Sequence, residues 1–165
     1  AQLLGEALRT AGIRVAVDDR TDVGFGRRAT AWELKGVPVR VELGPRDLAE
    51  EQATVVRRDA EGKTTLPLSG LPDAISDLLE RIQDEMLAAA TEQRDARTVD
   101  VDGVEDALAA AATGFARIPW GRLDEEALTA LKAEVVTVRC LQDADGDVAM
   151  SDDDPDSIAT VGRSY

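Results

Sequence analysis

The sequence predicts an α/β fold in which a mixed sheet is flanked by helices, followed by a small α+β domain. Stretches with an apolar residue at every second position alternate with stretches whose apolar residues recur at three- and four-residue steps. The first pattern is typical of half-buried strands and the second of amphipathic helices, and their mixed order favours an α/β class. We place the domain boundary after the longest helical stretch, which gives domains at 1–98 and 99–165.

The first domain is expected to begin with an amphipathic helix over residues 1–11 that ends at Gly12, a common helix-terminating residue. Ile13, Val15 and Val17 then alternate with other residues, so we expect a strand there. The other expected elements are a short helix at 29–34, strands at 37–43, 53–58 and 64–68, a helical turn at 45–50, and a long helix at 71–97.

In the second domain the same patterns predict helices at 101–114 and 123–132 and strands at 115–120, 134–141 and 158–161. Residues 143–156 contain seven aspartates and no basic side chain, which is typical of a solvated loop. Loose calcium binding by these aspartates is the weaker alternative, because their spacing does not make a full EF-hand loop.

Composition excludes several kinds of chemistry. The chain has no histidine and a single cysteine, Cys140. It therefore lacks Ser–His and Cys–His pairs, imidazole metal ligands, an internal disulfide and a cysteine-based zinc site. We expect no catalytic residue and no metal site. One cysteine, together with no run of 18 apolar residues and no secretory signal, favours a reducing, cytoplasmic setting.

Charge is distributed unevenly along the chain. The net charge is -14, which argues against phosphate contacts, yet residues 1–70 hold 11 basic and 11 acidic side chains. Residues 71–165 hold 8 basic and 22 acidic side chains and so carry the whole excess. The first half can therefore still present a local basic surface. The acidic bias fits either a high-GC genome or a salt-loving organism.

The most informative stretch is residues 32–47, which reads WELKGVPVRVELGPRD. It places an alternating strand between turn signals at Gly36 and at Gly44-Pro45. This run, with R-R-D at 57–59 and Lys63 beyond it, resembles the anticodon-binding domain of prolyl-tRNA synthetases of the archaeal and eukaryote-like branch. The resemblance is close over residues 1–97 and looser to the end. Threonyl-, histidyl- and glycyl-tRNA synthetases share the fold, but the joined motifs are similar to the prolyl type.

The resemblance implies a parent enzyme, a proline–tRNA ligase, that would use ATP and Mg²⁺ in a catalytic domain and act as a homodimer. Its partners would be a proline tRNA, through the anticodon loop, and that catalytic domain. No class II catalytic motif occurs in these 165 residues, so we expect this chain to bind RNA and catalyse nothing. The family's domain begins with a strand that is missing here, so we expect a fragment, the rival being a shortened gene product. Other hypotheses are a free-standing tRNA- or protein-binding module and an acidic interaction protein that has lost RNA binding.

A proline anticodon carries two guanines, each of which offers two acceptors and two donor groups at its edges. Arginine matches the acceptors and a carboxylate matches the donors. By resemblance, Glu33 is assigned to one guanine and Arg40 to the other. Arg46 and Asp47, on the turn after the strand, are expected to contact the same bases or the loop phosphates, and Lys63 completes the set.

Several of these residues have a plainer interpretation. Glu33 could pair with Lys35 or Arg40 at the end of a helix. Asp18-Asp19-Arg20 suggests an ion-pair or metal cluster, although a turn stabilised by aspartate side chains is favoured. Trp32 could stack on a base but is more often a core residue. Arg57 and Arg58 are as readily surface charge as binding groups.

The second domain departs from the family at Cys140. Many members of the family hold zinc in this domain through four cysteines, whereas Cys140 is the sole cysteine of this sequence. We therefore expect a domain that keeps the fold without zinc ligands. The closing Gly162–Tyr165 is similar to the family's tyrosine terminus, which suggests that the natural end of the protein is present.

Overall fold

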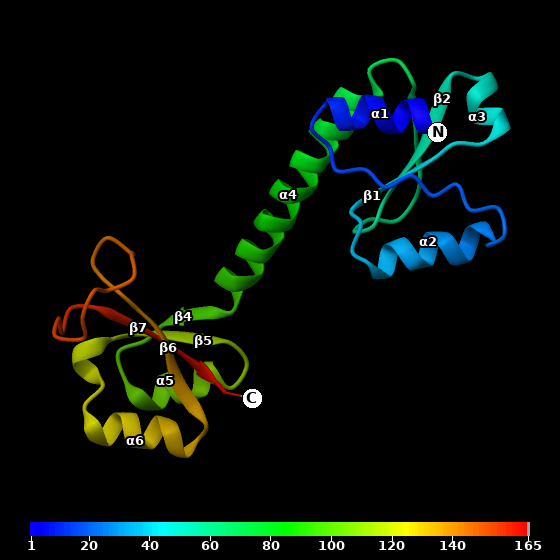
Figure 1. Cartoon of the computed structure of the whole chain (residues 1–165). Coiled ribbons are helices and arrows are strands. Elements are labelled where there is room, and N and C mark those ends of the chain that lie inside the picture. The colour runs from blue at the N-terminus through cyan, green and yellow to red at the C-terminus, as the bar shows by residue number, and fades with distance from the viewer. Residues whose placement is uncertain (165) are drawn as a thin grey trace. The chain divides into compact units, whose positions relative to one another are not determined.

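The computed structural model describes residues 1–164 and divides the chain into two compact units, Ala1–Leu87 and Ala88–Tyr165. Both units combine helices with a sheet, so the predicted α/β class is confirmed (Figure 1). The domain boundary expected after residue 98 stays a prediction. Within the described residues, no helix is both long and apolar enough to cross a membrane.

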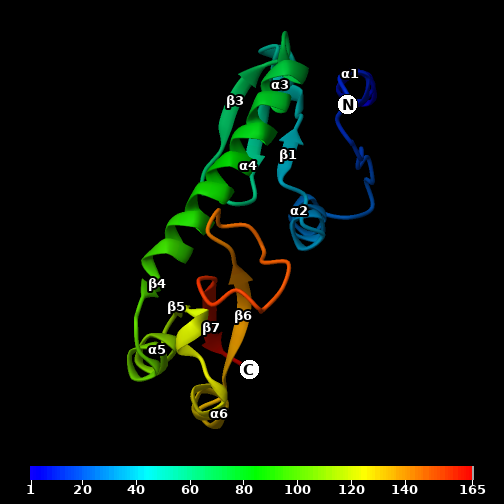
Figure 2. The ribbon, with the colours of Figure 1, turned by 90° about the vertical axis from the view of Figure 1, so that its left-hand side faces the viewer.

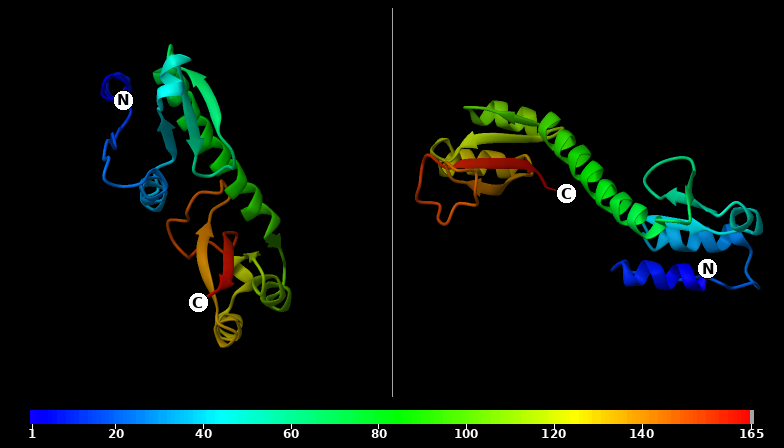
Figure 3. Two further views of the ribbon diagram at one scale, coloured as in Figure 1. Left: turned by 90° about the vertical axis from the view of Figure 1, so that its right-hand side faces the viewer. Right: turned by 90° about the horizontal axis from the view of Figure 1, so that it is seen from above.

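The first unit is built on a three-stranded antiparallel sheet in the order β1-β2-β3. Its strands are β1 (Val39–Glu42), β2 (Gln52–Arg57) and β3 (Thr64–Pro67), and its helices are α1 (Gln2–Thr10), α2 (Phe25–Leu34), α3 (Pro45–Ala49) and the first part of α4 (Leu71–Ala96). Helix α4 covers one face of the sheet. It lies in front of the strands in Figure 2 and behind them in the opposite view, the left panel of Figure 3.

The strands of this sheet have one apolar and one polar face. Ala53 and Val55 of β2 are buried with Leu8 of α1 and with Leu71 and Ile75 of α4. Burial of a Leu or Ile side chain contributes about 1.5–3 kcal/mol, so these contacts fix both helices on the sheet. Because side chains alternate along a strand, the intervening residues of β1 and β2 lie on the opposite, open face.

The strand predicted at Ile13–Val17 is wrong. The segment is extended and its burial alternates as expected, with Ile13 and Val15 packed against the core of the first unit. It belongs to neither sheet formed by the described residues. Alternation reports which side chains are buried, whereas a strand also requires a neighbouring backbone to share hydrogen bonds.

The second unit contains a four-stranded mixed sheet in the order β4-β5-β7-β6. Its elements are β4 (Thr98–Asp100), α5 (Val104–Ala111), β5 (Phe115–Pro119), the 3₁₀ helix η1 (Trp120–Arg122), α6 (Glu125–Ala133), β6 (Val136–Gln142) and β7 (Ile158–Arg163). Figure 1 shows α5 and α6 on the same face of this sheet, and their buried residues share one core with β5, β6 and β7.

Strand β4 was not predicted, and the helix expected from residue 101 begins only at Val104. Three residues are too few for a detectable alternation, and β4 pairs in parallel with β5 directly after the long helix. The pairing demands a close approach at Gly114, where a Cβ atom would lie 2.1 Å from the carbonyl oxygen of Arg97. Only glycine fits there without a shift of the backbone.

Candidate functional site

The candidate site lies on the open face of the first unit's sheet, between two turns that set its geometry. Helix α2 ends at Leu34, and Gly36 follows with φ 78°, a left-handed conformation that suits glycine. Helix α3 starts with Pro45, and the backbone N–H of Gly44 donates to the Asp47 carboxylate at 2.8 Å. Strand β1 is held between these turns, so Arg40 and Glu42 project from the same face.

Four charged side chains form one connected network on this face. Arg40 donates from Nη1 to Glu33 Oε1 at 2.5 Å and from Nε to Glu42 Oε1 at 3.0 Å. Lys63 donates from Nζ to the other oxygen of Glu42, Oε2, at 2.8 Å. The network joins α2, β1 and the residue before β3, and its two cations balance its two carboxylates.

The inner members of the network are well shielded from solvent. The side chains of Arg40 and Glu42 are only 21% and 14% exposed. Burial works to raise the pKa of Glu42, but the hydrogen bonds from Lys63 and Arg40 outweigh it and hold that pKa below its usual value. Burial likewise opposes the charge on Arg40, whose pKa is nevertheless raised by its bonds to Glu33 and Glu42. Both groups are therefore charged at neutral pH.

Three of the five predicted site residues, Glu33, Arg40 and Lys63, are thus brought together. The structure also accommodates the plainer interpretation of Glu33, because its carboxylate does pair with Arg40. The link that joins Arg40 to Lys63 is Glu42, which the sequence reasoning missed. Its signal was present: opposite charges two residues apart on a strand share a face and can pair.

Arg46 and Asp47 lie on α3, outside this network. Arg46 is 88% exposed and pairs with Glu50 one helical turn later, at 3.0 Å. Asp47 uses one oxygen for the Gly44 N–H and accepts from Thr54 Oγ1 with the other at 3.2 Å. Asp47 therefore anchors α3 to β2 and fixes the helix from which Arg46 projects.

A second polar cluster attaches α2 to the extended segment before it. Asp18 accepts from Trp32 Nε1 at 2.8 Å, from Arg20 Nη2 at 2.7 Å, and from the backbone N–H of Arg20 at 3.3 Å. The hydrogen bond from Arg20, followed by that from Trp32, holds the pKa of Asp18 far below its usual range. The turn and ion-pair interpretations of this segment are both present in the structure, and Trp32 is half-buried with Lys35 Nζ 4.2 Å from its ring centre.

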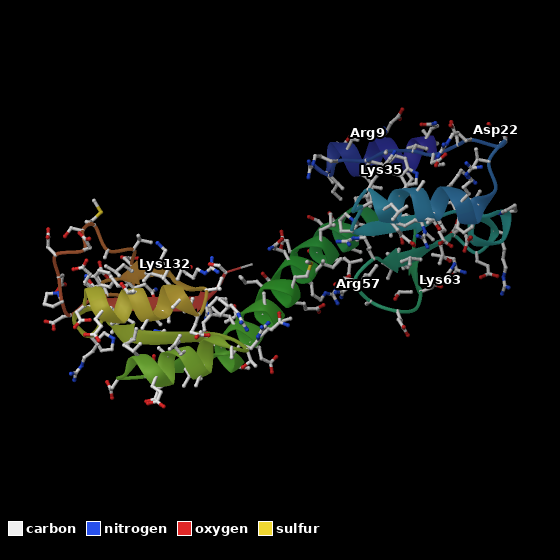
Figure 4. The ribbon with its side chains drawn as sticks, turned by 90° about the horizontal axis from the view of Figure 1, so that it is seen from below. Arg9, Asp22, Lys35, Arg57, Lys63 and Lys132 are labelled. Atoms are coloured by element: carbon white, nitrogen blue, oxygen red, sulfur yellow. The ribbon has the colours of Figure 1, made fainter. Side chains whose placement is uncertain are left out.

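A small hollow opens beside Arg40. Its lining is Trp32, Glu33, Val37, Arg40, Val56, Arg57 and Arg58. Arg57 is bound to Asp59 at 2.7 Å and to Glu85 of α4 at 2.6 Å, so it ties β2 to α4. Arg58 is exposed, and its backbone N–H donates to the carbonyl oxygen of Pro38. Figure 4 labels Lys35, Arg57 and Lys63 among the side chains of this unit.

The second unit offers no comparable polar site among the described residues. Cys140 is a half-buried free thiol of β6, and residues 1–164 contain no group of histidine, cysteine and carboxylate side chains arranged to hold a metal. In the Asp-rich loop, Asp143 accepts from the backbone N–H groups of Asp145 and Asp147, both at 3.0 Å. This carboxylate stabilises its own turn.

Comparison with known proteins gives consistent matches. A family model described as an anticodon binding domain matches residues 1–78. A proline–tRNA ligase of Frankia alni is 48% identical over 100% of this chain and 36% of its own length, and a proline–tRNA ligase 2 of Streptomyces avermitilis is 50% identical over 98% and 34%. The crystal structure of prolyl-tRNA synthetase from Cryptosporidium parvum with L-proline and AMP matches with a TM-score of 0.81 at 28% identity, over 99% of this chain and 37% of that one. The chain thus spans about a third of the length of these relatives.

Proposed function

Since this chain belongs to the prolyl-tRNA synthetase family, we propose that its first unit reads the guanines in the anticodon of a proline tRNA. The observation that carries the proposal is the network of Glu33, Arg40 and Lys63 around Glu42 on the open face of the sheet. It presents a guanidinium and a carboxylate side by side, which are the two groups that the edge of an unpaired guanine requires.

The hydrogen bonds of the network leave suitable atoms for a base. In residues 1–164 the bonds of Arg40 use Nε and Nη1, and the bond of Glu33 uses Oε1. Arg40 Nη2 remains to donate to a guanine acceptor, and Glu33 Oε2 remains to accept from a guanine N–H. These two atoms come from one ion pair on the face of the sheet, so a base laid against that face would meet a donor and an acceptor together.

The balanced charge of the network favours base edges over phosphates. Phosphate binding depends on excess positive charge and weakens steeply with salt. The two cations of the network are already neutralised by Glu33 and Glu42. We assign any contact with the loop phosphates to exposed cations such as Arg46. Asp47 would act by holding α3, the helix that carries Arg46, next to the anticodon bases.

For the parent protein we propose ATP-dependent charging of tRNA with proline. ATP and Mg²⁺ would bind in a catalytic domain outside this chain, and the enzyme would act in the cytoplasm as a homodimer. Within this chain, residues 1–98 would be the anticodon-binding domain and residues 99–165 a C-terminal domain without zinc ligands. No residue of the chain is assigned a catalytic role.

The test is binding of the chain to a proline tRNA and to the same tRNA with both anticodon guanines replaced. We expect replacement to weaken binding ten-fold or more, since each paired contact contributes ~1–3 kcal/mol of discrimination. Arg40→Ala should abolish most of the difference. The matched control is Arg14→Ala, which removes an exposed arginine of the same unit and should leave the difference intact. Equal binding of both tRNAs by the unaltered chain would contradict the proposal.

A further inference from the structure

We propose that Glu42 is a positioning residue that makes the site select bases instead of binding any RNA, an inference that rests on the proposed function. The side chain of Glu42 is 14% exposed and pairs with two cations at once, with Arg40 through Oε1 and with Lys63 through Oε2. It touches no base in this scheme and acts through Arg40 and Lys63.

The geometry gives Glu42 control over where both cations point. Arg40 and Lys63 have long, flexible side chains, and fixing either of them costs side-chain conformational entropy. Glu42 Oε1 fixes the inner nitrogen of Arg40, Nε, and so directs the outer end of the guanidinium toward Glu33. Glu42 Oε2 accepts from Lys63, which directly precedes β3 and so belongs to the other edge of the sheet, across β2 from β1.

The residues that face Arg40 and Glu42 on β2 cannot take over this function. In the register of β1 and β2, Glu42 stands opposite Thr54 and Arg40 stands opposite Val56. Val56 has no polar group, and the Thr54 hydroxyl already donates to Asp47. Without the Glu42 carboxylate, Arg40 would keep only Glu33, and Lys63 would lose the partner that it has in this network.

Glu42 also sets the net charge of the site. With Glu42 ionised, the four side chains carry no net charge. Without the Glu42 carboxylate, the remaining three side chains carry a net charge of +1, and Lys63 loses this ion pair. A free cation attracts phosphate irrespective of sequence. Loss of Glu42 should therefore raise affinity for the wrong RNA while it lowers preference for the right one. A residue with only a structural function would instead weaken binding to both RNAs in parallel when replaced.

Two replacements separate orientation from charge. Gln at position 42 keeps the size but replaces one of the two carboxylate oxygens, each of which accepts from one cation, by an NH2 group that only donates. Glu42→Gln therefore turns a donor toward one of the two cations and removes one negative charge. Glu42→Asp keeps the charge but is one methylene shorter, so it cannot reach both cations at once. The control is Glu61→Gln, which removes the same charge from an exposed turn outside the network.

The experiment measures dissociation constants of these proteins for proline tRNA and for the guanine-replaced tRNA over a range of salt concentrations. For Glu42→Gln we expect discrimination to fall from ten-fold or more to about three-fold or less. Its affinity for the replaced tRNA should rise about two- to three-fold at low salt, and the slope of log K against log salt should steepen by about one. Glu42→Asp keeps the net charge of the site, so it should lose discrimination with a smaller change of slope than Glu42→Gln, and Glu61→Gln should keep discrimination.

The outcomes distinguish this inference from the function on which it rests. If the unaltered chain fails to discriminate, the proposed function is wrong and the inference is wrong with it. If the unaltered chain discriminates and Glu42→Gln weakens both tRNAs equally, the inference alone is overturned. Thermal unfolding verifies that each variant is folded. Should Glu42→Gln not fold, retained discrimination in Glu42→Asp would overturn the inference by itself.

Discussion

The two units of this chain are stabilised in different ways. Among the described residues, eight of the ten ion pairs lie within Ala1–Leu87, whose sheet covers a buried cluster of only five residues. The second unit has a ten-residue buried cluster and two exposed ion pairs. The first unit therefore relies on directed polar contacts to place its side chains, whereas the second relies on packing.

The difference indicates which unit is suited to RNA. Residues 88–165 hold 7 basic and 17 acidic side chains, a surface that repels phosphate, while residues 1–87 hold 12 and 16. Connected hydrogen-bond networks hold their side chains in one arrangement, which is what recognition of a base edge needs. The sequence supplies a probe for each unit, because its two tryptophans, Trp32 and Trp120, fall in different units.

The largest expected effect is loss of packing in the second unit. Leu131→Ala removes a side chain that is 1% exposed and should lower the free energy of unfolding of this unit by about 2–5 kcal/mol. The measurement is denaturant unfolding followed by Trp120 fluorescence in a Trp32→Phe background. Met150→Ala, at a fully exposed position, should change the free energy of unfolding by less than about 0.5 kcal/mol. Equal effects of the two replacements would show that the second unit lacks the packed core described here.

A smaller effect is expected at the start of α3. Asp47→Ala removes the acceptor of the Gly44 N–H and the partner of Thr54, so the first unit should lose about 0.5–2 kcal/mol. Trp32 fluorescence in a Trp120→Phe background reports this unit. Asp47→Asn, which keeps an acceptor oxygen, should recover part of the loss. No destabilisation by Asp47→Ala would show that the carboxylate does not hold α3.

Acid should destabilise the first unit through the network. The folded-state pKa of Glu42 lies below its ordinary value of 4.5, so its contribution is present above pH 4.5 and is lost as pH falls through the lowered folded-state pKa. The measurement is the Trp32-detected unfolding midpoint between pH 6 and pH 2. Glu42→Gln should flatten this dependence and Glu61→Gln should not. An equally steep dependence in Glu42→Gln would contradict the ionised network.

The smallest effect on stability is expected at Arg46. Its pair with Glu50 is an exposed i,i+4 contact worth about 0.3–0.5 kcal/mol, so Arg46→Ala should scarcely change unfolding. The same replacement should weaken binding of proline tRNA measurably and reduce its salt dependence, because an exposed cation near the site can contact phosphate. Unchanged binding would remove Arg46 from the proposed interface.

Much of this fold could be predicted because periodicity reports burial. The long helix expected at 71–97 is observed at Leu71–Ala96, and strand β1 lies within the predicted 37–43. The same signal was wrong at Ile13–Val17, where burial alternates without a paired backbone, and it missed β4, which is too short to show a period.

The candidate site was less predictable than the fold. Resemblance supplied Glu33, Arg40 and Lys63, but only the strand register and the turns at Gly36 and Gly44 place them around Glu42. Residues 40 and 63 are far apart in sequence, and their link depends on an antiparallel pairing that local patterns do not specify.

We propose that the first unit reads RNA and that the second does not. The most direct test is amide hydrogen exchange of the whole chain with and without proline tRNA. We expect added protection at residues 33–47 and around Lys63, reduced when the two anticodon guanines are replaced, and no change over residues 98–164. Protection confined to the second unit, or equal protection by both tRNAs, would show that the first unit does not read the anticodon guanines.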